Sequence, residues 1–236
     1  MSEGACLGKV SIERYKWHHK RFTNKWPNHW KDENDFGGFF RWKLSIETEN
    51  SHILDDIYRG ETYRRLCRIL PRWQAYRPVD SSICLNRLET SLERMSQAYN
   101  HIRNCTLLAL DKVPNDQLRI IWDELGSIKE DKGEANSSST YSVKATTTPL
   151  MLLWGQTLTF DSNVRRNFLE DFPMYPKHLF ANNWSFENWK KAMKRVQEDL
   201  KSSPEVENYF RMESLEKLGT DSCVPYGRFL DIHYYY

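Results

Sequence analysis

The sequence predicts a mainly α-helical, bundle-like protein. Three observations support this fold class. Apolar residues recur at spacings of three and four over most of the chain after residue 50, and Ser, Asp, Pro and Gly stand where the helices should begin and end. Alternation of apolar and polar residues is confined to one short run, at 36–46. With 236 residues, the chain can bury a core without disulfide staples.

Residues 14–31 form a cationic and aromatic arm that contains no acidic residue. Its members are Arg14, Lys16, Lys20, Arg21, Lys25 and Lys31, interleaved with Tyr15, Trp17, Phe22, Trp26, Trp30 and three histidines. Cations that alternate with flat rings suit a nucleic acid, because the charges meet phosphates while the rings stack on exposed bases. In the alternative interpretation, the rings pack on the domain and the lysine stems cover them.

The next two segments are expected to be a strand and a helix. The run FGGFFRWKLSI at 36–46 predicts a short strand or hairpin edge near the N-terminus. A helix should begin with Ser51 as its N-cap and run to Leu70, where Pro71 should stop it. The other face of this helix and the residues just after it form a second basic patch, which consists of Arg59, Arg64, Arg65, Arg68, Arg72 and Arg77. It is either a phosphate-binding face or an arginine-rich exterior that pairs with acids elsewhere.

The clearest helix is expected over 82–103. It carries a continuous apolar stripe that consists of Leu85, Leu88, Leu92, Met95, Tyr99 and Ile102, which we assign to the core. A shorter helix should begin at Pro114 and end at Gly126. The polar segment 129–140, KEDKGEANSSST, predicts a flexible loop. The chain is therefore either one helical domain over 1–236 or two lobes, of about 1–130 and 141–236, joined by this loop.

Further helices are expected after the loop. Their predicted starts are 146–149, Asp161, Ser185 and Ser203-Pro204, and their predicted ends are Gly155, Phe172-Pro173 and Gly219. The segment that follows 146–149 is apolar on all sides and should be buried. The aromatic tail 226–236 should dock on the body, because exposing those rings would be costly.

Charge and composition exclude several classes of protein. Lys plus Arg number 34 and Asp plus Glu 32, so the net charge of +2 excludes an acidic solvating chain and a histone-like polycation. The five cysteines form no zinc-finger pattern and indicate reduced thiols of an intracellular protein. We expect no signal peptide, membrane span, metal site or cofactor. Phosphate-loop, dinucleotide, zincin and serine-hydrolase signatures are absent from the sequence.

The stretch from Lys144 to Arg166 reads KATTTPLMLLWGQTLTFDSNVRR. It resembles the core of the helix-hairpin-helix DNA glycosylases, in which a hairpin ends near a lysine and a buried apolar helix follows. A short loop then presents an aspartate that starts the next helix, with an arginine close behind. The chain departs from the family at the hairpin, where 139–143 lacks the two usual glycines, and at Pro149, which delays the expected helix start.

The resemblance implies a metal-independent DNA glycosylase or AP lyase with Lys144 and Asp161 as its catalytic residues. A partly buried lysine loses its charge by desolvation and can attack the anomeric carbon of a flipped nucleotide, forming a Schiff base. The aspartate would stabilise the developing oxocarbenium charge or align a water. The residues also fit a simpler interpretation, in which Asp161 only caps its helix and Lys144 is solvated.

Two functions therefore stay open. In the first, the chain is a nucleic-acid-binding helical protein that excises a DNA base. In the second, it is a non-catalytic intracellular interaction module with an unknown protein partner. Under the first hypothesis, the residues expected to contact nucleic acid are Arg14, Lys16, Trp17, Lys20, Arg21, Lys25, Trp26, Trp30, Arg64, Arg65, Arg68 and Arg165.

Overall fold

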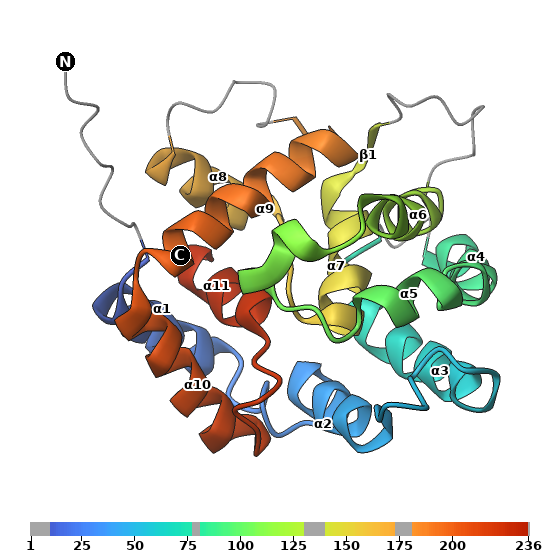
Figure 1. Ribbon diagram of the computed structural model, residues 1–236, viewed down its shortest axis with the longest axis horizontal. Helices are drawn as coiled ribbons and strands as arrows, with labels where there is room; N and C mark the ends of the chain where they lie inside the picture. The colour runs from blue at the N-terminus through green and yellow to red at the C-terminus, as the bar shows by residue number, and fades with distance from the viewer. Residues whose placement is uncertain (1–9, 77–80, 130–139, 173–180, 236) are drawn as a thin grey trace.

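Helices dominate the computed structural model, which describes residues 10–76, 81–129, 140–172 and 181–235 (Figure 1). The elements in chain order are α1 (Ile12–Lys25), α2 (Phe36–Ile46), α3 (Asp56–Arg72), α4 (Ser81–Arg94), α5 (Ser96–Ile102), the 3-10 helix η1 (Leu107–Lys112), α6 (Asn115–Gly126), β1 (Thr140–Ser142), α7 (Val143–Trp154), α8 (Ser162–Asp171), β2 (Asn183–Ser185), α9 (Phe186–Lys201), α10 (Pro204–Leu218) and α11 (Tyr226–Tyr234). The prediction of a mainly α-helical fold is confirmed.

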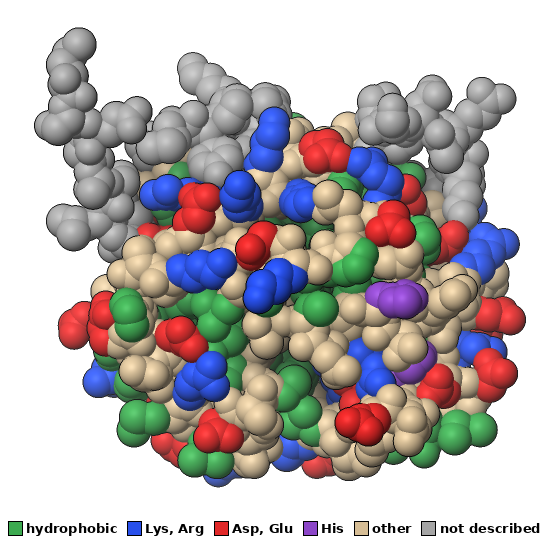
Figure 2. Space-filling model, viewed as in Figure 1, with side chains coloured by type: hydrophobic (Ala, Val, Ile, Leu, Met, Phe, Trp, Pro, Cys, Tyr) green, Lys and Arg blue, Asp and Glu red, His purple; other side chains and the backbone are tan. Residues whose placement is uncertain are grey.

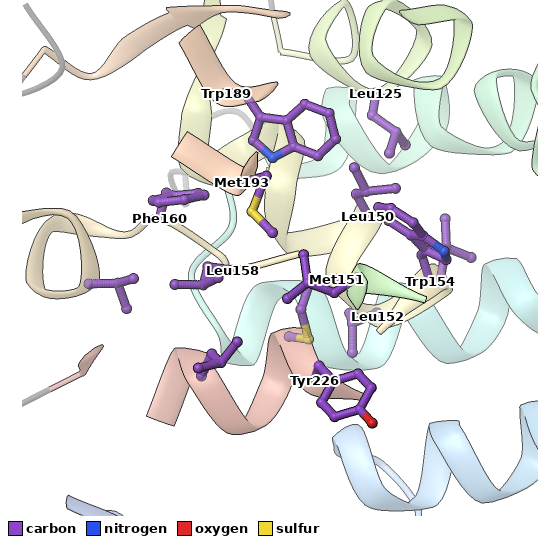
Figure 3. Close-up of a cluster of buried hydrophobic side chains, with 14 of the residues drawn as sticks. Leu125, Leu150, Met151, Leu152, Trp154, Leu158, Phe160, Trp189, Met193 and Tyr226 are labelled. Carbon is purple, nitrogen blue, oxygen red and sulfur yellow. The ribbon is translucent and has the colours of Figure 1, made fainter. Parts of the chain in front are cut away.

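Helix α7 lies at the centre of the core. Its residues are buried from Ala145 to Trp154, and it packs against α2, α3 and α6. Figure 3 shows its apolar side chains among those of three other helices, namely Leu125 of α6, Trp189 and Met193 of α9, and Tyr226 of α11. A helix that is apolar on all sides must be enclosed in this way to remove its side chains from water.

The two ends of the described chain lie side by side. Helix α1 packs along α11, and α8 also contacts α11 (Figure 1). Tyr15 meets Phe229 edge to face, with ring centroids 6.1 Å apart. The buried hydrophobic residues of the described ranges form one continuous cluster, which includes the aromatic tail. The predicted docking of the tail on the body is thus observed for 226–235, and residue 236 lies outside the described residues.

The strand predicted at 36–46 is wrong, because this segment forms helix α2. Asp35 caps the helix, its carboxylate accepting a hydrogen bond from the Phe36 backbone amide at 2.7 Å. Buried side chains recur at 36, 39, 40 and 43, which is helical spacing. Gly37 fits here because a Cβ at this position would collide with the carbonyl oxygen of Trp30.

The helix predicted to have Ser51 as its N-cap begins four residues later, after the N-cap Asp55. The Asp55 carboxylate accepts a hydrogen bond from the His52 backbone amide at 2.7 Å, which keeps the chain before α3 out of the helix. Pro71 lies in the last turn of α3 instead of stopping it. So close to the end, a proline removes only one intrahelical hydrogen bond.

The long helix predicted over 82–103 is divided at Met95, where ψ is 0°, into α4 and α5. Its apolar stripe is nevertheless in the core as predicted, with Leu88, Leu92, Met95, Tyr99 and Ile102 buried. The predicted starts and ends of the remaining helices agree with the structure at Pro114, Gly126, Asp161, Ser185, Ser203 and Gly219.

The predicted start of the central helix at 146–149 is wrong, because α7 already begins at Val143. The hydroxyls of Thr146, Thr147 and Thr148 donate hydrogen bonds to the carbonyl oxygens four residues earlier. These bonds satisfy the buried hydroxyls, so the three threonines can lie inside the helix instead of before it. Pro149 consequently sits within α7, and Lys144 belongs to its first turn.

The predicted loop at 129–140 lies almost entirely outside the described residues. Immediately after it, β1 pairs antiparallel with β2, with Tyr141 opposite Trp184. This pairing joins the segment before α7 to the segment before α9. Within the described ranges, no helix combines the length and apolar character needed to cross a membrane.

Candidate functional site

A cavity of about 340 Å³ lies where the ends of the described chain meet its middle. It is lined by side chains from α1, α3, α7, α11 and the connections between helices, namely Phe22, Lys25, Trp26, His29, Asp35, Arg72, Trp73, Gln74, Lys144, Thr148, Thr159, Asp161, Arg228, Asp231 and Tyr235. Its volume falls in the range of pockets that hold small organic molecules. Lys144 and Asp161, singled out from the sequence, both line it.

Asp161 reaches the cavity as the N-cap of α8. Its Oδ1 accepts hydrogen bonds from the backbone amides of Asn163, at 2.9 Å, and Val164, at 3.0 Å. The predicted capping role is therefore real. Neither Oδ2 of Asp161 nor the ammonium of Lys144 makes a hydrogen bond or ion pair to any described residue. One carboxylate oxygen thus fixes the side chain, while the other remains available to a ligand.

A chain of buried hydrogen bonds forms one side of the cavity. Arg228 of α11 donates from Nη1 to Asp231 Oδ2 at 2.6 Å and from Nε to His29 Nε2 at 3.0 Å. His29 Nδ1 lies 2.9 Å from Asp35 Oδ1. Because Nε2 accepts from the guanidinium, Nδ1 carries the imidazole proton and donates it to Asp35. The ring is accordingly neutral, and it links α11 to the N-cap of α2.

Burial sets the protonation states along this chain. It lowers the pKa of His29 to about 4, with the positive charge of Arg228 acting in the same direction. Burial opposes ionisation of Asp35, but the hydrogen bond from His29, the hydrogen bond from the Phe36 backbone amide and the positive charge of Arg228 together lower the pKa of that carboxyl. Burial raises the pKa of Asp231, although nearby Arg228 favours its ionised form.

The neutral, buried His29 should make folding stability depend on pH. In the unfolded chain its pKa returns to about 6.5, so between about pH 6.5 and 4 only the unfolded state takes up this proton. Stability should therefore fall as the pH drops through this window, by about 3 kcal/mol from this ring. Urea unfolding at several pH values measures the slope.

His29→Gln keeps a donor and an acceptor in this position but cannot titrate, so it should flatten the slope. The matched control is His101→Gln, at an exposed histidine. A slope that is the same in both variants would show that His29 does not remain neutral in the folded protein.

Aromatic rings form much of the remaining wall. Phe22 and Trp26 come from the end of α1, Trp73 follows α3, and Tyr235 follows α11. The Trp73 indole donates from Nε1 to Asp35 Oδ1 at 3.0 Å, and the Arg228 guanidinium lies 4.6 Å from its ring centroid. Flat rings beside hydrogen-bonding groups suit a planar, partly polar ligand.

Two described residues have a positive φ without being glycine, one lining the cavity and the other next to a residue that lines it. Gln74 has φ 53° and lines it, and Phe160 has φ 46° and immediately precedes Asp161. Such residues cost free energy and persist only where the surroundings enforce them, and they are concentrated at functional sites. Within the described ranges these are the only non-glycine residues of this kind.

The structure divides the predicted arm 14–31 between the core and the surface. Helix α1 buries Tyr15, His18 and Phe22, whereas Lys16, Lys20, Arg21 and Lys25 are exposed. Trp17 is 53% exposed with the Arg21 guanidinium 4.5 Å from its ring, and Trp26 is 41% exposed. Trp30 is buried, and Arg14 pairs with Asp171. The arm reaches the cavity through Phe22, Lys25, Trp26 and His29, so Lys25 is the one cation of the arm that lines it.

Ion pairs neutralise part of the second basic patch. Arg64 and Arg65 both pair with Glu61, at 3.2 and 2.9 Å, while Arg68 is exposed. Arg72 lines the cavity and pairs with Asp32 at 3.0 Å, and Arg77 lies outside the described residues. On the face shown in Figure 2, cationic and acidic side chains are likewise interspersed. Among the described residues of this patch, Arg72 alone lines the cavity.

Arg165, predicted to contact nucleic acid, is buried and serves the scaffold. It donates to the Ala181 carbonyl at 2.6 Å and to Asn182 Oδ1 at 2.7 Å. Sequence reasoning missed most of the cavity lining, including His29, Asp35, Arg228 and Asp231. The available signal was Arg228-x-x-Asp231 within the aromatic tail, because charged residues in a segment that docks must be paired.

No cluster of His, Cys, Asp and Glu within the described ranges could hold a metal ion. Comparison with known proteins adds no family: no protein-family model, no curated protein and no solved structure matches this chain.

Proposed function

We propose that the chain is a nucleic-acid-binding protein that excises a base from DNA, with Lys144 as the nucleophile and Asp161 as the stabilising carboxylate. The observation that carries the proposal is that both side chains line one cavity, although they are 17 positions apart along the chain. The aromatic walls and the cations around them support it, since an extruded base is held by stacking and by hydrogen bonds to its edge.

In the proposed reaction, the amine of Lys144 gives up its ammonium proton and attacks C1′ of a nucleotide turned into the cavity. The bond from C1′ to the base breaks, and the base leaves with the bonding electrons and takes up a proton. The nitrogen, now bonded to C1′, loses a proton. Its lone pair then forms the C1′=N bond of the Schiff base as the C1′–O4′ bond breaks, and O4′ leaves with the bonding electrons and takes up a proton. Asp161 Oδ2, the oxygen that does not cap α8, stabilises the positive charge that develops on the sugar.

The two roles of Asp161 can be separated by substitution. Asp161→Asn should keep stability near the wild-type value, because Asn caps a helix about as well as Asp, whereas Asp161→Ala should cost about 1 kcal/mol. Base release should slow in both variants while DNA affinity changes little, since the carboxylate acts on charge that develops in the transition state.

Thermal unfolding measures the stability, and single-turnover base release measures the catalytic role. A matched control is Ser185→Ala, which removes the N-cap of α9. The Ser185 hydroxyl accepts a hydrogen bond from the Asn188 backbone amide at 3.2 Å. This variant should lose similar stability without slowing base release. Full activity in Asp161→Asn would reduce Asp161 to a cap and remove it from the reaction.

DNA binding should use the exposed cations of α1, because this helix ends at the cavity. Each neutralised phosphate contributes about 0.9 to the slope of log affinity against log salt. Replacing Lys16, Lys20, Arg21 and Lys25 with Ala should therefore flatten the slope by up to about 3 to 4. Fluorescence anisotropy with a labelled duplex at several salt concentrations gives the slope.

The matched control replaces four lysines of α9, namely Lys190, Lys191, Lys194 and Lys201. This variant loses the same charge from a helix that does not line the cavity. Unchanged affinity and slope in the α1 variant would show that its cations form only a solvated surface.

A further inference from the structure

One nitrogen of the buried guanidinium in the cavity is left for a ligand. Arg228 is 4% exposed, yet it lines the cavity. Its Nε donates a hydrogen bond to His29 and its Nη1 donates one to Asp231, whereas Nη2 makes no hydrogen bond to a described residue. Although it has no such partner, Nη2 is not sealed off from solvent. This N–H group therefore opens into the cavity.

The surroundings hold Arg228 firmly in place. Its guanidinium carbon lies 5.0 Å from the Phe22 ring centroid and 4.6 Å from that of Trp73. Asp231 is fixed in turn, because its Oδ1 accepts from the backbone amide of Thr159 at 2.8 Å and from its hydroxyl at 2.6 Å. A donor with so little freedom discriminates by position as well as by charge.

The charges around the cavity favour a neutral acceptor. Four cationic and three carboxylate side chains line it, and His29 is neutral. The Asp231 carboxylate contacts the guanidinium directly at Nη1, and the Asp35 carboxylate is linked to it through the His29 ring. A doubly charged phosphate beside them would meet repulsion, whereas a carbonyl oxygen accepts a hydrogen bond without adding charge.

We propose that the base taken into this cavity carries a ring carbonyl whose oxygen accepts a hydrogen bond from Arg228 Nη2. This inference rests on the proposed function and names its substrate class. Arginine donates to the carbonyl oxygen of a purine in the same manner when it reads guanine in DNA. An amino group at that position would place donor against donor and leave the buried guanidinium without its partner.

The test compares two duplexes that differ only at position 6 of one purine, which is a carbonyl in hypoxanthine and an amino group in adenine. Wild-type protein should release hypoxanthine at least about tenfold faster than adenine under single-turnover conditions. Free hypoxanthine should likewise bind the wild-type protein more tightly than free adenine in calorimetric titrations. This second measurement does not depend on any variant.

Arg228→Lys keeps the charge but loses the planar fork, so the ratio of the two release rates should fall to within about threefold. The ratio is the readout, because partial unfolding lowers both rates together. The matched control is Arg103→Lys, which alters a buried arginine that donates to the carbonyls of Thr48 and Ser51 and does not line the cavity. This control should keep the wild-type ratio.

The outcomes separate the inference from the proposed function. An adduct with abasic DNA but no preference for hypoxanthine over adenine overturns the carbonyl assignment and leaves the chemistry of Lys144 standing. A preference that persists in Arg228→Lys also overturns it, because another group must then read the base. Failure to form any adduct with abasic DNA overturns the proposed function itself.

Discussion

Changing Lys144 to alanine should abolish the covalent adduct that borohydride traps between this protein and abasic duplex DNA. An abasic site presents an aldehyde at C1′, which condenses with a lysine amine to give an imine and water. Borohydride delivers hydride to that carbon and fixes the bond as a secondary amine. Without the amine in the cavity, trapping should fall to background, the largest effect that we expect of any substitution.

Two further variants separate chemistry from charge and folding. Lys144→Arg keeps a cation in the first turn of α7 but cannot form the imine, so it should also lose trapping. Lys112→Ala removes an exposed lysine that does not line the cavity and should trap like the wild type. Gel analysis of labelled DNA detects the adduct. Trapping retained in Lys144→Ala would show that a different amine reacts.

Replacing Arg228 with methionine should destabilise the fold by about 3–5 kcal/mol, because it leaves the Asp231 carboxylate buried without its cation. Asp231 is 2% exposed, and its Oδ2 lies 2.6 Å from Arg228 Nη1. His29 would lose the donor to its Nε2 as well. Equilibrium unfolding in guanidinium chloride should therefore show a large decrease in the free energy of unfolding.

Removing both charges should restore part of this loss. In the double variant Arg228→Met with Asp231→Asn, no buried charge is left unpaired, and the Asn oxygen can still accept from the Thr159 amide. Arg211→Met is the matched control at the surface, where its partner is Glu207, and should cost less than about 1 kcal/mol. If Arg228→Met and Arg211→Met both lowered the free energy of unfolding by the same small amount, the buried pairing of Arg228 with Asp231 would be contradicted.

Helical periodicity predicts the fold where it extends over several turns and fails where two periods are compatible with one short segment. The stripe from Leu85 to Ile102 repeats often enough to exclude a strand, and it is in the core even though Met95 breaks the helix. At 36–46 the apolar residues at 40, 42, 44 and 46 alternate with polar ones, while those at 36, 39 and 40 follow helical spacing, so both periods are compatible with this segment. The cap at Asp35 and the close approach to Trp30 decide the outcome, and both involve residues outside the segment.

The candidate site is predictable only in part. Lys144 and Asp161 are identified by the order of residues within one contiguous stretch, to which the resemblance applies. His29 and Arg228, by contrast, are brought together from opposite ends of the chain by the packing of α1 on α11. No local pattern encodes a hydrogen bond between such distant residues, so this part of the cavity requires the tertiary structure.

Mass spectrometry of the borohydride-reduced adduct tests the central claim most directly, namely that the cavity holds the reacting nucleotide beside Lys144. After digestion with trypsin and nuclease, the modified residue can be identified from fragment masses. We expect the sugar remnant on Lys144, with no comparable modification of Lys25, the other lysine that lines the cavity. Attachment to Lys25, to a lysine outside the cavity or to the N-terminal amine, or the absence of any adduct, would contradict the claim.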